Sequence, residues 1–283
     1  MSSERVILVT GANKGIGFEL VKKLVGSKDT VVLACRDLNR GQEALKQLGN
    51  QMNVHLIQLD TSSPQSIQEA TEQIKKKFGH LDVLVNNAGI AKHEKSLQAA
   101  TEIFGTNYHG IKKVNQHFLP LMNKNGRIVN VSSEVGAWTL DQCSDELKQK
   151  LLHPNLTEAE LDKIVESFFH AIENHTEAEN GFPAESPFLI YGMSKTALNM
   201  YTRIHPAGYE SMIAVCPGYC ATDLNNHTGG RTASVGADSV LFVVNDKSVE
   251  NGKFYQDGKL KPWSYPCDTD LTKLLDSNKQ KQK

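Results

Sequence analysis

The chain has 283 residues, 39% of them hydrophobic and 22% charged, which suits a soluble globular protein of one large α/β domain or two small ones. A net charge of −1 gives no support for a nucleic-acid or membrane-surface partner, and no apolar run approaches the roughly 20 residues that span a bilayer. Five scattered cysteines without a CxxC pair, and a start without the apolar core of a signal peptide, predict a cytoplasmic protein with neither disulfides nor a metal site.

A glycine-rich turn separates the first two expected elements, a strand at residues 5–9 and a helix at residues 18–25. The turn reads Thr10-Gly11-Ala12-Asn13-Lys14-Gly15-Ile16-Gly17. Gly11 permits a tight turn, Gly15 lets the backbone approach a pyrophosphate, and Gly17 lets the helix pack close to the strand. The GxxxGxG spacing differs from the better-known GxGxxG fingerprint, and a plain strand-to-helix turn is the alternative. We favour dinucleotide binding because a strand precedes the turn and a helix follows it.

The second expected strand, residues 30–35, ends at the position where an acidic residue would bind the ribose hydroxyls of NAD. Here the strand ends without a carboxylate and is followed by Arg36, which together with Lys14 could hold a 2′-phosphate. Asp37 argues against this unless its side chain points elsewhere, and the two basic residues could also be solvated surface charges. We favour NADPH over NADH.

Strands and helices continue to alternate along the chain. We expect helices at residues 40–48, 64–78 and 97–122 and strands at residues 54–59, 83–85 and 127–131. This rhythm predicts a Rossmann-type doubly wound parallel sheet of about seven strands, with helices on both faces. Ligands of such sheets bind at the carboxyl ends of the strands.

Polar residues follow three of these strands and should therefore meet at one edge of the sheet. Asp60 suits the adenine end of a dinucleotide, while Asn86-Asn87-Ala88-Gly89 suits its middle or simply caps a strand. Ser132 and Ser133 end the fifth strand, where a hydroxyl can bind a substrate carbonyl or merely terminate the strand. Asn107, inside the long expected helix, is the kind of residue that is usually packed or solvated, but it could kink the helix and expose a carbonyl.

Tyr191 and Lys195 lie four residues apart on a helix that we expect to end before Pro206. A free tyrosine titrates near pH 10, about three units too high for efficient proton transfer at neutral pH. A nearby cation lowers the pKa of the phenol, so the pair could protonate a developing alkoxide or act as a base in the reverse direction. Taken alone, this spacing is more often an amphipathic accident.

The remaining chain contains a helical insertion and three further elements. We expect the insertion at about residues 141–176, with helices at 145–153 and 158–175, then a strand at 211–216, a helix at 234–244 and a strand at 253–256. The apolar stripe of the second insertion helix favours core packing over a partner site. Residues 225–230 could form a substrate lid or an ordinary loop. We expect residues 1–283 to form one domain, with a partly disordered tail at about residues 267–283.

Taken together, these motifs resemble those of the short-chain dehydrogenase/reductase family over roughly residues 4–258. The resemblance rests on Thr10-Gly11…Gly15…Gly17, Asp60, Asn86-Asn87-Ala88-Gly89, Asn107, Ser133, Tyr191…Lys195 and Pro217-Gly218…Thr222. Within the family the chain is most similar to monomeric NADPH-dependent carbonyl reductases, through stretches such as residues 13–17 and Arg36-Asp37.

The resemblance implies a role for each residue. Tyr191 would be the acid/base, Lys195 would lower its pKa and hold the nicotinamide ribose, and Ser133 would orient the substrate carbonyl. Asn107 would tie Lys195 to a proton-relay water. NADP(H) would be bound by Gly11, Asn13, Lys14, Gly15, Ile16, Gly17, Arg36, Asp60, Asn87, Ala88, Gly89, Tyr191, Lys195, Pro217, Gly218 and Thr222.

The resemblance also implies an activity and an oligomeric state. The expected reaction is the NADPH-dependent reduction of aldehydes, ketones or quinones. The alternatives are a dedicated steroid, prostaglandin or pteridine reductase, and a non-catalytic NADP(H)-binding sensor or scaffold. Ser133 and Tyr191 are 191 − 133 = 58 positions apart, farther than in the commonest family pattern, because the insertion lies between them. In most of the family the tyrosine helix forms a subunit interface, which the insertion would cover, so we expect a monomer.

Overall fold

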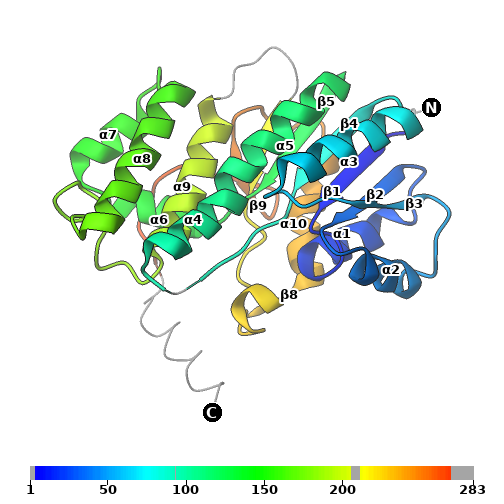
Figure 1. Ribbon diagram of the computed structural model, residues 1–283, viewed down its shortest axis with the longest axis horizontal. Helices are drawn as coiled ribbons and strands as arrows, with labels where there is room; N and C mark the ends of the chain where they lie inside the picture. The colour runs from blue at the N-terminus through cyan, green and yellow to red at the C-terminus, as the bar shows by residue number, and fades with distance from the viewer. Residues whose placement is uncertain (1–3, 93, 205–210, 269–283) are drawn as a thin grey trace.

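The structure, a computed structural model, describes residues 4–92, 94–204 and 211–268 (Figure 1). The main sheet consists of β1 (Val6–Thr10), β2 (Thr30–Cys35), β3 (Val54–Gln58), β4 (Leu81–Asn86), β5 (Met122–Val131), β6 (Ser211–Val215), β9 (Phe254–Gln256) and β10 (Lys259–Lys261). These strands lie in the order β3-β2-β1-β4-β5-β6-β9-β10, and all neighbours are parallel except β9 and β10. The doubly wound sheet is thus confirmed. The tail expected to be disordered lies outside the described residues beyond Asp268.

The expected count of about seven strands is one too low, because it omits β10. This strand pairs with β9 across a two-residue turn, Asp257-Gly258, whose φ angles are 50° and 74°. Two positive φ angles at an Asp-Gly pair are the mark of a tight hairpin turn. The Asp-Gly turn predicts this hairpin more clearly than the sequence of β10 does, since β10 has only three residues, Lys-Leu-Lys. A separate two-stranded sheet joins β7 (Cys220–Ala221) to β8 (Arg231–Thr232).

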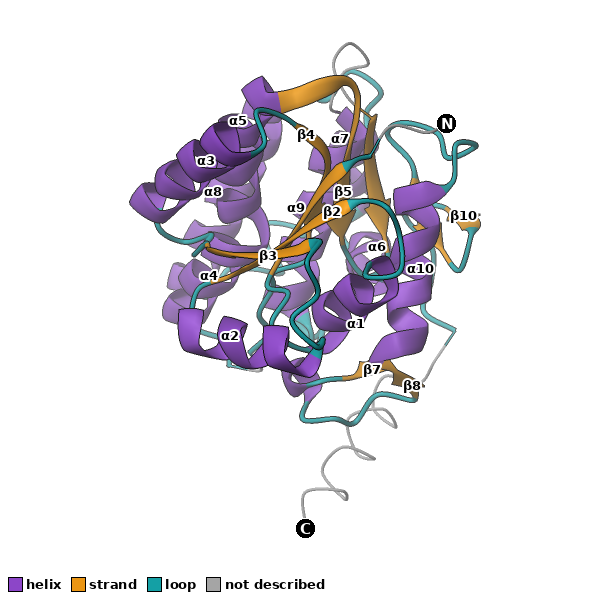
Figure 2. Cartoon of the chain, turned by 90° about the vertical axis from the view of Figure 1, so that its right-hand side faces the viewer, coloured by secondary structure: helices purple, strands orange, loops and turns teal. Residues whose placement is uncertain are grey.

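Helices cover both faces of the sheet (Figure 2). One face carries α1 (Gly15–Leu24), α2 (Leu38–Gln47) and α10 (Ala233–Asn245), and the other carries α3 (Pro64–Lys77), α4 (Leu97–Phe104), α5 (Ile111–Phe118) and α9 (Leu189–Ile204). Alternate residues of β1 show the two layers, because side chains of a strand point to opposite faces. Ile7 and Val9 belong to the core under the first group, and Val6 and Leu8 to the core under the second.

The continuous helix expected at residues 97–122 is divided in the structure. Between α4 and α5 the chain forms a π-helix, η1 (Gly105–Gly110), and after α5 a short 3-10 turn, η2 (Leu119–Leu121), leads into β5. β5 therefore begins at Met122 rather than at residue 127. Asn107 lies in the π-helix, and such widened turns occur frequently at functional sites.

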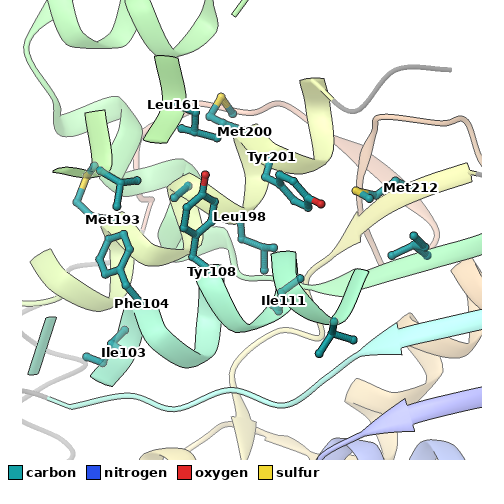
Figure 3. Packing of buried hydrophobic residues seen from close by; sticks show 14 of the residues in the cluster. Ile103, Phe104, Tyr108, Ile111, Leu161, Met193, Leu198, Met200, Tyr201 and Met212 are labelled. Carbon is teal, nitrogen blue, oxygen red and sulfur yellow. The ribbon is translucent and has the colours of Figure 1, made fainter. Parts of the chain in front are cut away.

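The insertion folds as α7 (Asp145–Leu152) and α8 (Glu158–Asn174), close to the expected helices, after α6 (Glu134–Gln142), which the sequence analysis missed. α8 packs against α4 and α9, and Leu161 and Tyr108 belong to the same hydrophobic core (Figure 3). The hydroxyl of Tyr108, in the π-helix, donates to Asp162 of α8 at 2.8 Å. Its acidic face holds Lys112, whose ammonium lies 2.6 Å from Asp162 and 2.7 Å from Glu158. The insertion therefore covers α9 and the segment that contains Asn107.

Candidate active site

A cavity of about 590 Å³ opens at the carboxyl ends of the parallel strands. The chain segments that follow β1 to β6 all contribute to its wall. The expected site residues on the wall are Gly11, Asn13, Lys14, Gly15, Ile16, Arg36, Asp60, Asn87, Ala88, Gly89, Ser133, Tyr191, Lys195, Pro217, Gly218 and Thr222. Gly17 and Asn107 are buried and lie outside this wall. The structure thus brings every expected cofactor residue except Gly17, and every expected catalytic residue except Asn107, to one cavity.

The glycine-rich turn is built by close contact with the end of β4. Gly11 has a φ of +62°, and a Cβ atom there would lie 3.0 Å from the backbone of Ala88. The amide of Asn87 donates to the carbonyls of Thr10 at 2.8 Å and Gly11 at 3.3 Å. Asn87 is therefore more than a strand cap, since it holds the turn in place.

The start of α1 offers an anion site beside this turn. Lys14 is its N-cap residue and makes no side-chain capping bond within the described chain, so the N–H groups of the first turn remain available. A helix N-terminus of this kind attracts phosphate groups. The turn, without side chains at Gly11 and Gly15, leaves room for a pyrophosphate against the backbone. The residues present therefore fit a dinucleotide.

The charges at the end of β2 favour a phosphate over free ribose hydroxyls. Arg36, Asp37 and Arg40 all line the cavity there. The carboxylate of Asp37 accepts hydrogen bonds from the backbone N–H groups of Asn39 at 2.9 Å and Arg40 at 3.1 Å. Because this carboxylate caps α2, the objection that Asp37 raised against a 2′-phosphate is weakened.

Lys14 reaches across the cavity to the opposite loop. Its ammonium lies 2.6 Å from the carboxylate of Asp223, which also lies 2.9 Å from the His227 ring. Both partners of the lysine bridge are more than half exposed, so the pair contributes little to stability. The loop with Asn225, Asn226 and Thr228 forms part of the cavity wall, as a substrate lid would.

Ser133 and Tyr191 both line the cavity. The Ser133 hydroxyl lowers the pKa of the Tyr191 phenol, and it also accepts from the N–H of Val135 at 3.1 Å as the cap of α6. The neighbouring hydroxyl of Ser132 donates instead to Asn199 at 2.6 Å. Of the two serines, Ser133 is therefore the one directed to the tyrosine.

Lys195 is buried beside this pair. Its ammonium donates to the carbonyl of Val131 at 2.9 Å and lies 5.8 Å from the ring centre of Tyr191. Burial lowers the pKa of Lys195 to about 8, partly opposed by the nearby Cys216. Burial raises the pKa of Tyr191, as does Cys216, while the Ser133 hydrogen bond lowers it. In this structure burial outweighs the effect of Ser133 on the tyrosine pKa, so lowering of that pKa by Lys195 stays a prediction.

The lowered pKa of Lys195 predicts a pH-dependent contribution to stability. The unfolded chain holds this proton up to about pH 10.5, whereas the folded protein releases it near pH 8. Between these values the unfolded state binds more protons, so the free energy of unfolding should rise with pH, by about 3 kcal/mol at most. Thermal melts across this range should therefore show the wild type gaining stability relative to Lys195→Met as the pH rises. Equal pH slopes of the two proteins would contradict the lowered pKa of Lys195.

Asn107 connects the π-helix to the segment after β4, through Ile90, and to α9, through Ser194. Its side-chain oxygen accepts from the N–H of Ile90 at 2.9 Å, and its amide donates to the carbonyl of Ile90 at 2.9 Å and to Ser194 at 3.1 Å. Ser194 in turn donates to the carbonyl of Tyr191 at 2.7 Å. The side chain of Asn107 is thus fully engaged, and any relay role falls to its backbone carbonyl.

Several wall residues were missed by the sequence analysis. They include Glu134, Val135, Trp138, Phe188, Tyr219 and Leu224. Trp138 lies on α6, which was not predicted, and Phe188 directly precedes α9. The direction in which their side chains point depends on packing, which the local sequence does not show. Burial raises the pKa of Cys216 to about 12, which keeps it a thiol at neutral pH. Apart from Glu134, these wall residues are apolar or aromatic.

A doubly wound sheet whose glycine-rich turn shares one cavity with a serine, a tyrosine and a lysine is characteristic of one family. The family model described as short chain dehydrogenase matches residues 5–144. The carbonyl reductase (NADPH) 1 of Sus scrofa is 35% identical over 282 residues, covering 94% of this chain and 96% of its own. The chain therefore belongs to the short-chain dehydrogenase/reductase family.

Solved structures agree with this assignment. Salutaridine reductase from Papaver somniferum is 32% identical and superimposes with a TM-score of 0.81, covering 89% of this chain and 99% of its own. The NADPH-bound carbonyl reductase from chicken fatty liver is 25% identical with a TM-score of 0.68, covering 93% and 96% of the two chains. Within the described residues, no helix is both long and apolar enough for a transmembrane span.

Proposed function

We propose that this protein reduces carbonyl compounds, namely aldehydes, ketones and quinones, to alcohols with NADPH. The observation that carries the proposal is the single cavity that the anion-binding turn shares with Ser133, Tyr191 and Lys195. Relatives whose names state carbonyl reduction with NADPH, such as the enzyme of Sus scrofa, support it. The apolar and aromatic residues of the cavity wall favour lipophilic substrates.

The chain's own residues suggest how NADPH is held. The backbone of the glycine-rich turn and the start of α1 receive the pyrophosphate, and Arg36, Arg40 and Lys14 attract the 2′-phosphate. For Lys14 to contribute, its bridge to Asp223 has to open or share the charge. Asp60, Asn87, Ala88 and Gly89, together with Pro217, Gly218 and Thr222, complete the wall along which the cofactor lies.

The catalytic roles follow from which groups can hold or move a proton. NADPH, when bound, supplies the hydride to the carbonyl carbon. Tyr191 gives its phenolic proton to the carbonyl oxygen, and Ser133 holds that oxygen by a hydrogen bond while sharing the tyrosine hydroxyl. Lys195, as a cation within reach of the ring, favours the phenolate that remains. The backbone of Asn107 receives the water that returns a proton.

We also propose that the protein is a cytoplasmic monomer whose residues 1–283 act as one domain. α8 packs against α4 and α9 and pairs with Lys112 through Asp162 and Glu158, which supports the idea that this face is already occupied within the chain. Sedimentation of the purified protein at several concentrations tests the monomer.

The proposed activity predicts a specific consumption of NADPH. With a panel of aldehydes, ketones and quinones, the absorbance of reduced cofactor should fall faster with NADPH than with NADH. Arg36→Ala should then raise the Kd for NADPH by roughly 10-fold or more, because a hydrogen-bonded charge pair typically contributes about 1.5–3 kcal/mol. The Kd for NADH should stay nearly constant.

A matched control for this prediction is Lys46→Ala. Lys46 is an exposed cation in the last turn of α2 and does not line the cavity formed by the described residues. It should leave both affinities unchanged. If Arg36→Ala weakens NADPH and NADH equally, Arg36 does not recognise the 2′-phosphate. If no carbonyl compound is turned over while NADPH still raises the melting temperature, the reductase proposal fails and cofactor binding remains.

A further inference from the structure

The C-terminal strap, defined here as residues 259–265, contacts the helix that begins at Ser133. Tyr265 donates a hydrogen bond to the carboxylate of Glu134, the first residue of α6, at 2.7 Å. Ser264 donates to the carboxylate of Asp141, near the other end of α6, at 3.1 Å. The strap therefore spans α6 almost from end to end, and none of its described residues lines the cavity.

The strap is itself fixed to the sheet. The Trp263 ring stacks on Phe254 of β9, with centres 5.7 Å apart and planes 12° apart, beside Ala137 of α6. Lys261 lies 3.0 Å from the same carboxylate oxygen of Glu134 that Tyr265 contacts, and 4.7 Å from the tyrosine ring centre. Glu134 is thus bound by two donors that are held independently of α6.

The opposite face of α6 lies against the tyrosine helix. Thr196 of α9 donates to the carbonyl of Gly136 at 2.7 Å. A Cβ atom on Gly136 would lie 2.7 Å from the backbone carbon of Lys195, so the two helices meet backbone to backbone. Glu134, Ala137 and Asp141 form the strap face by helical spacing, and Gly136 belongs to the other face. α6 is therefore clamped between the strap and the helix of Tyr191.

We propose that Tyr265, acting through Glu134, is a positioning residue for Ser133. The proposal rests on the role of Ser133 in the proposed function. The start of a helix is the part that frays most easily, and a hydrogen bond to a partly buried carboxylate restrains it. Since Glu134 follows Ser133 directly, releasing it lets the serine hydroxyl drift from Tyr191. Rates are sensitive to such drift, with about 100-fold lost for a misplacement of roughly 1 Å.

The test compares variants that alter the strap at its two contacts with α6. Tyr265→Phe should lower kcat roughly 10-fold, a part of the loss that a full 1 Å misplacement causes, and leave the Kd for NADPH unchanged. Ser264→Ala, which removes the contact at the far end of α6, should change kcat less than about twofold. In a Glu134→Ala background, Tyr265→Phe should cost nothing further, because the bond it removes is already lost. Equal kcat losses in Tyr265→Phe and Ser264→Ala, or an undiminished loss in the Glu134→Ala background, would overturn the proposal.

A second measurement does not depend on turnover. The N–H of Val135 is bonded to the Ser133 hydroxyl, so its hydrogen exchange reports directly on the placement of that group. Exchange at Val135 should accelerate in Tyr265→Phe and stay unchanged in Ser264→Ala. Unchanged exchange in Tyr265→Phe would defeat the strap proposal alone. Absence of wild-type turnover with every carbonyl tested would defeat the proposed function, and the exchange result would still decide the role of the strap.

Discussion

Tyr191→Phe is expected to lower kcat by about 10²–10⁴-fold, the usual contribution of a positioned acid. Phenylalanine keeps the ring and its packing, and the hydroxyl it removes belongs to a residue that lines the cavity together with Ser133. The groups proposed to hold the pyrophosphate and the 2′-phosphate are untouched. NADPH should therefore raise the melting temperature of the variant as much as that of the wild type. Single-turnover reduction of a quinone or ketone, followed by NADPH absorbance, measures the loss.

The control for this substitution is Tyr255→Phe. The Tyr255 hydroxyl accepts a hydrogen bond from the N–H of Glu250 at 2.9 Å, away from the described cavity wall. Tyr255→Phe removes the same hydroxyl oxygen from a tyrosine of the sheet and should leave kcat within about twofold of the wild-type value. If Tyr191→Phe turns over as fast as Tyr255→Phe, Tyr191 is not the proton donor, whatever its position.

The alternation of strands and helices along the chain, and the residues that follow the strands, could be predicted from the sequence for a physical reason. Each parallel strand ends at the same edge of the sheet, so Asp60, Asn87 and Ser133 had to approach one another once the alternation of elements was recognised. No knowledge of side-chain packing was needed. The choice between Ser132 and Ser133 was different, because it depends on Asn199 of α9 accepting from Ser132.

Features that depend on long-range packing escaped local patterns. The π-helix around Asn107 has two glycines among its six residues but no local pattern that specifies a widened turn, and Asn107 fixes it by contacts with Ile90 and Ser194. α6 contains Gly136 and is packed on two faces, by α9 and by the strap, so it shows no simple apolar stripe. The direction in which the pKa of Tyr191 shifts could not be predicted from the sequence either. Spacing alone suggested that Lys195 lowers its pKa, whereas burial acts in the opposite direction.

Gly17→Ala is expected to weaken NADPH binding at least roughly 10-fold and to lower the melting temperature by several degrees, since overpacking typically costs about 1–3 kcal/mol. An added Cβ atom would lie 2.4 Å from the amide nitrogen of Asn87 and 2.9 Å from the carbonyl of Gly11. That amide is the group that holds the glycine-rich turn against β4. Movement of the Asn87 side chain alone cannot relieve the clash, because the contact with Gly11 is with its backbone. α1 must therefore move away from the turn, and its N-terminus leaves the pyrophosphate position.

Gly26→Ala provides the matched control for this effect. Gly26 lies just after α1, is exposed, and an added Cβ atom there would meet nothing within 4 Å among the described atoms. It should leave the melting temperature and the Kd for NADPH nearly unchanged. Titration of both variants with NADPH, followed by fluorescence and thermal melting, separates local clash from a general intolerance of alanine near α1. If Gly17→Ala binds NADPH as tightly as Gly26→Ala, the close approach of α1 to the turn is not what shapes the pyrophosphate site.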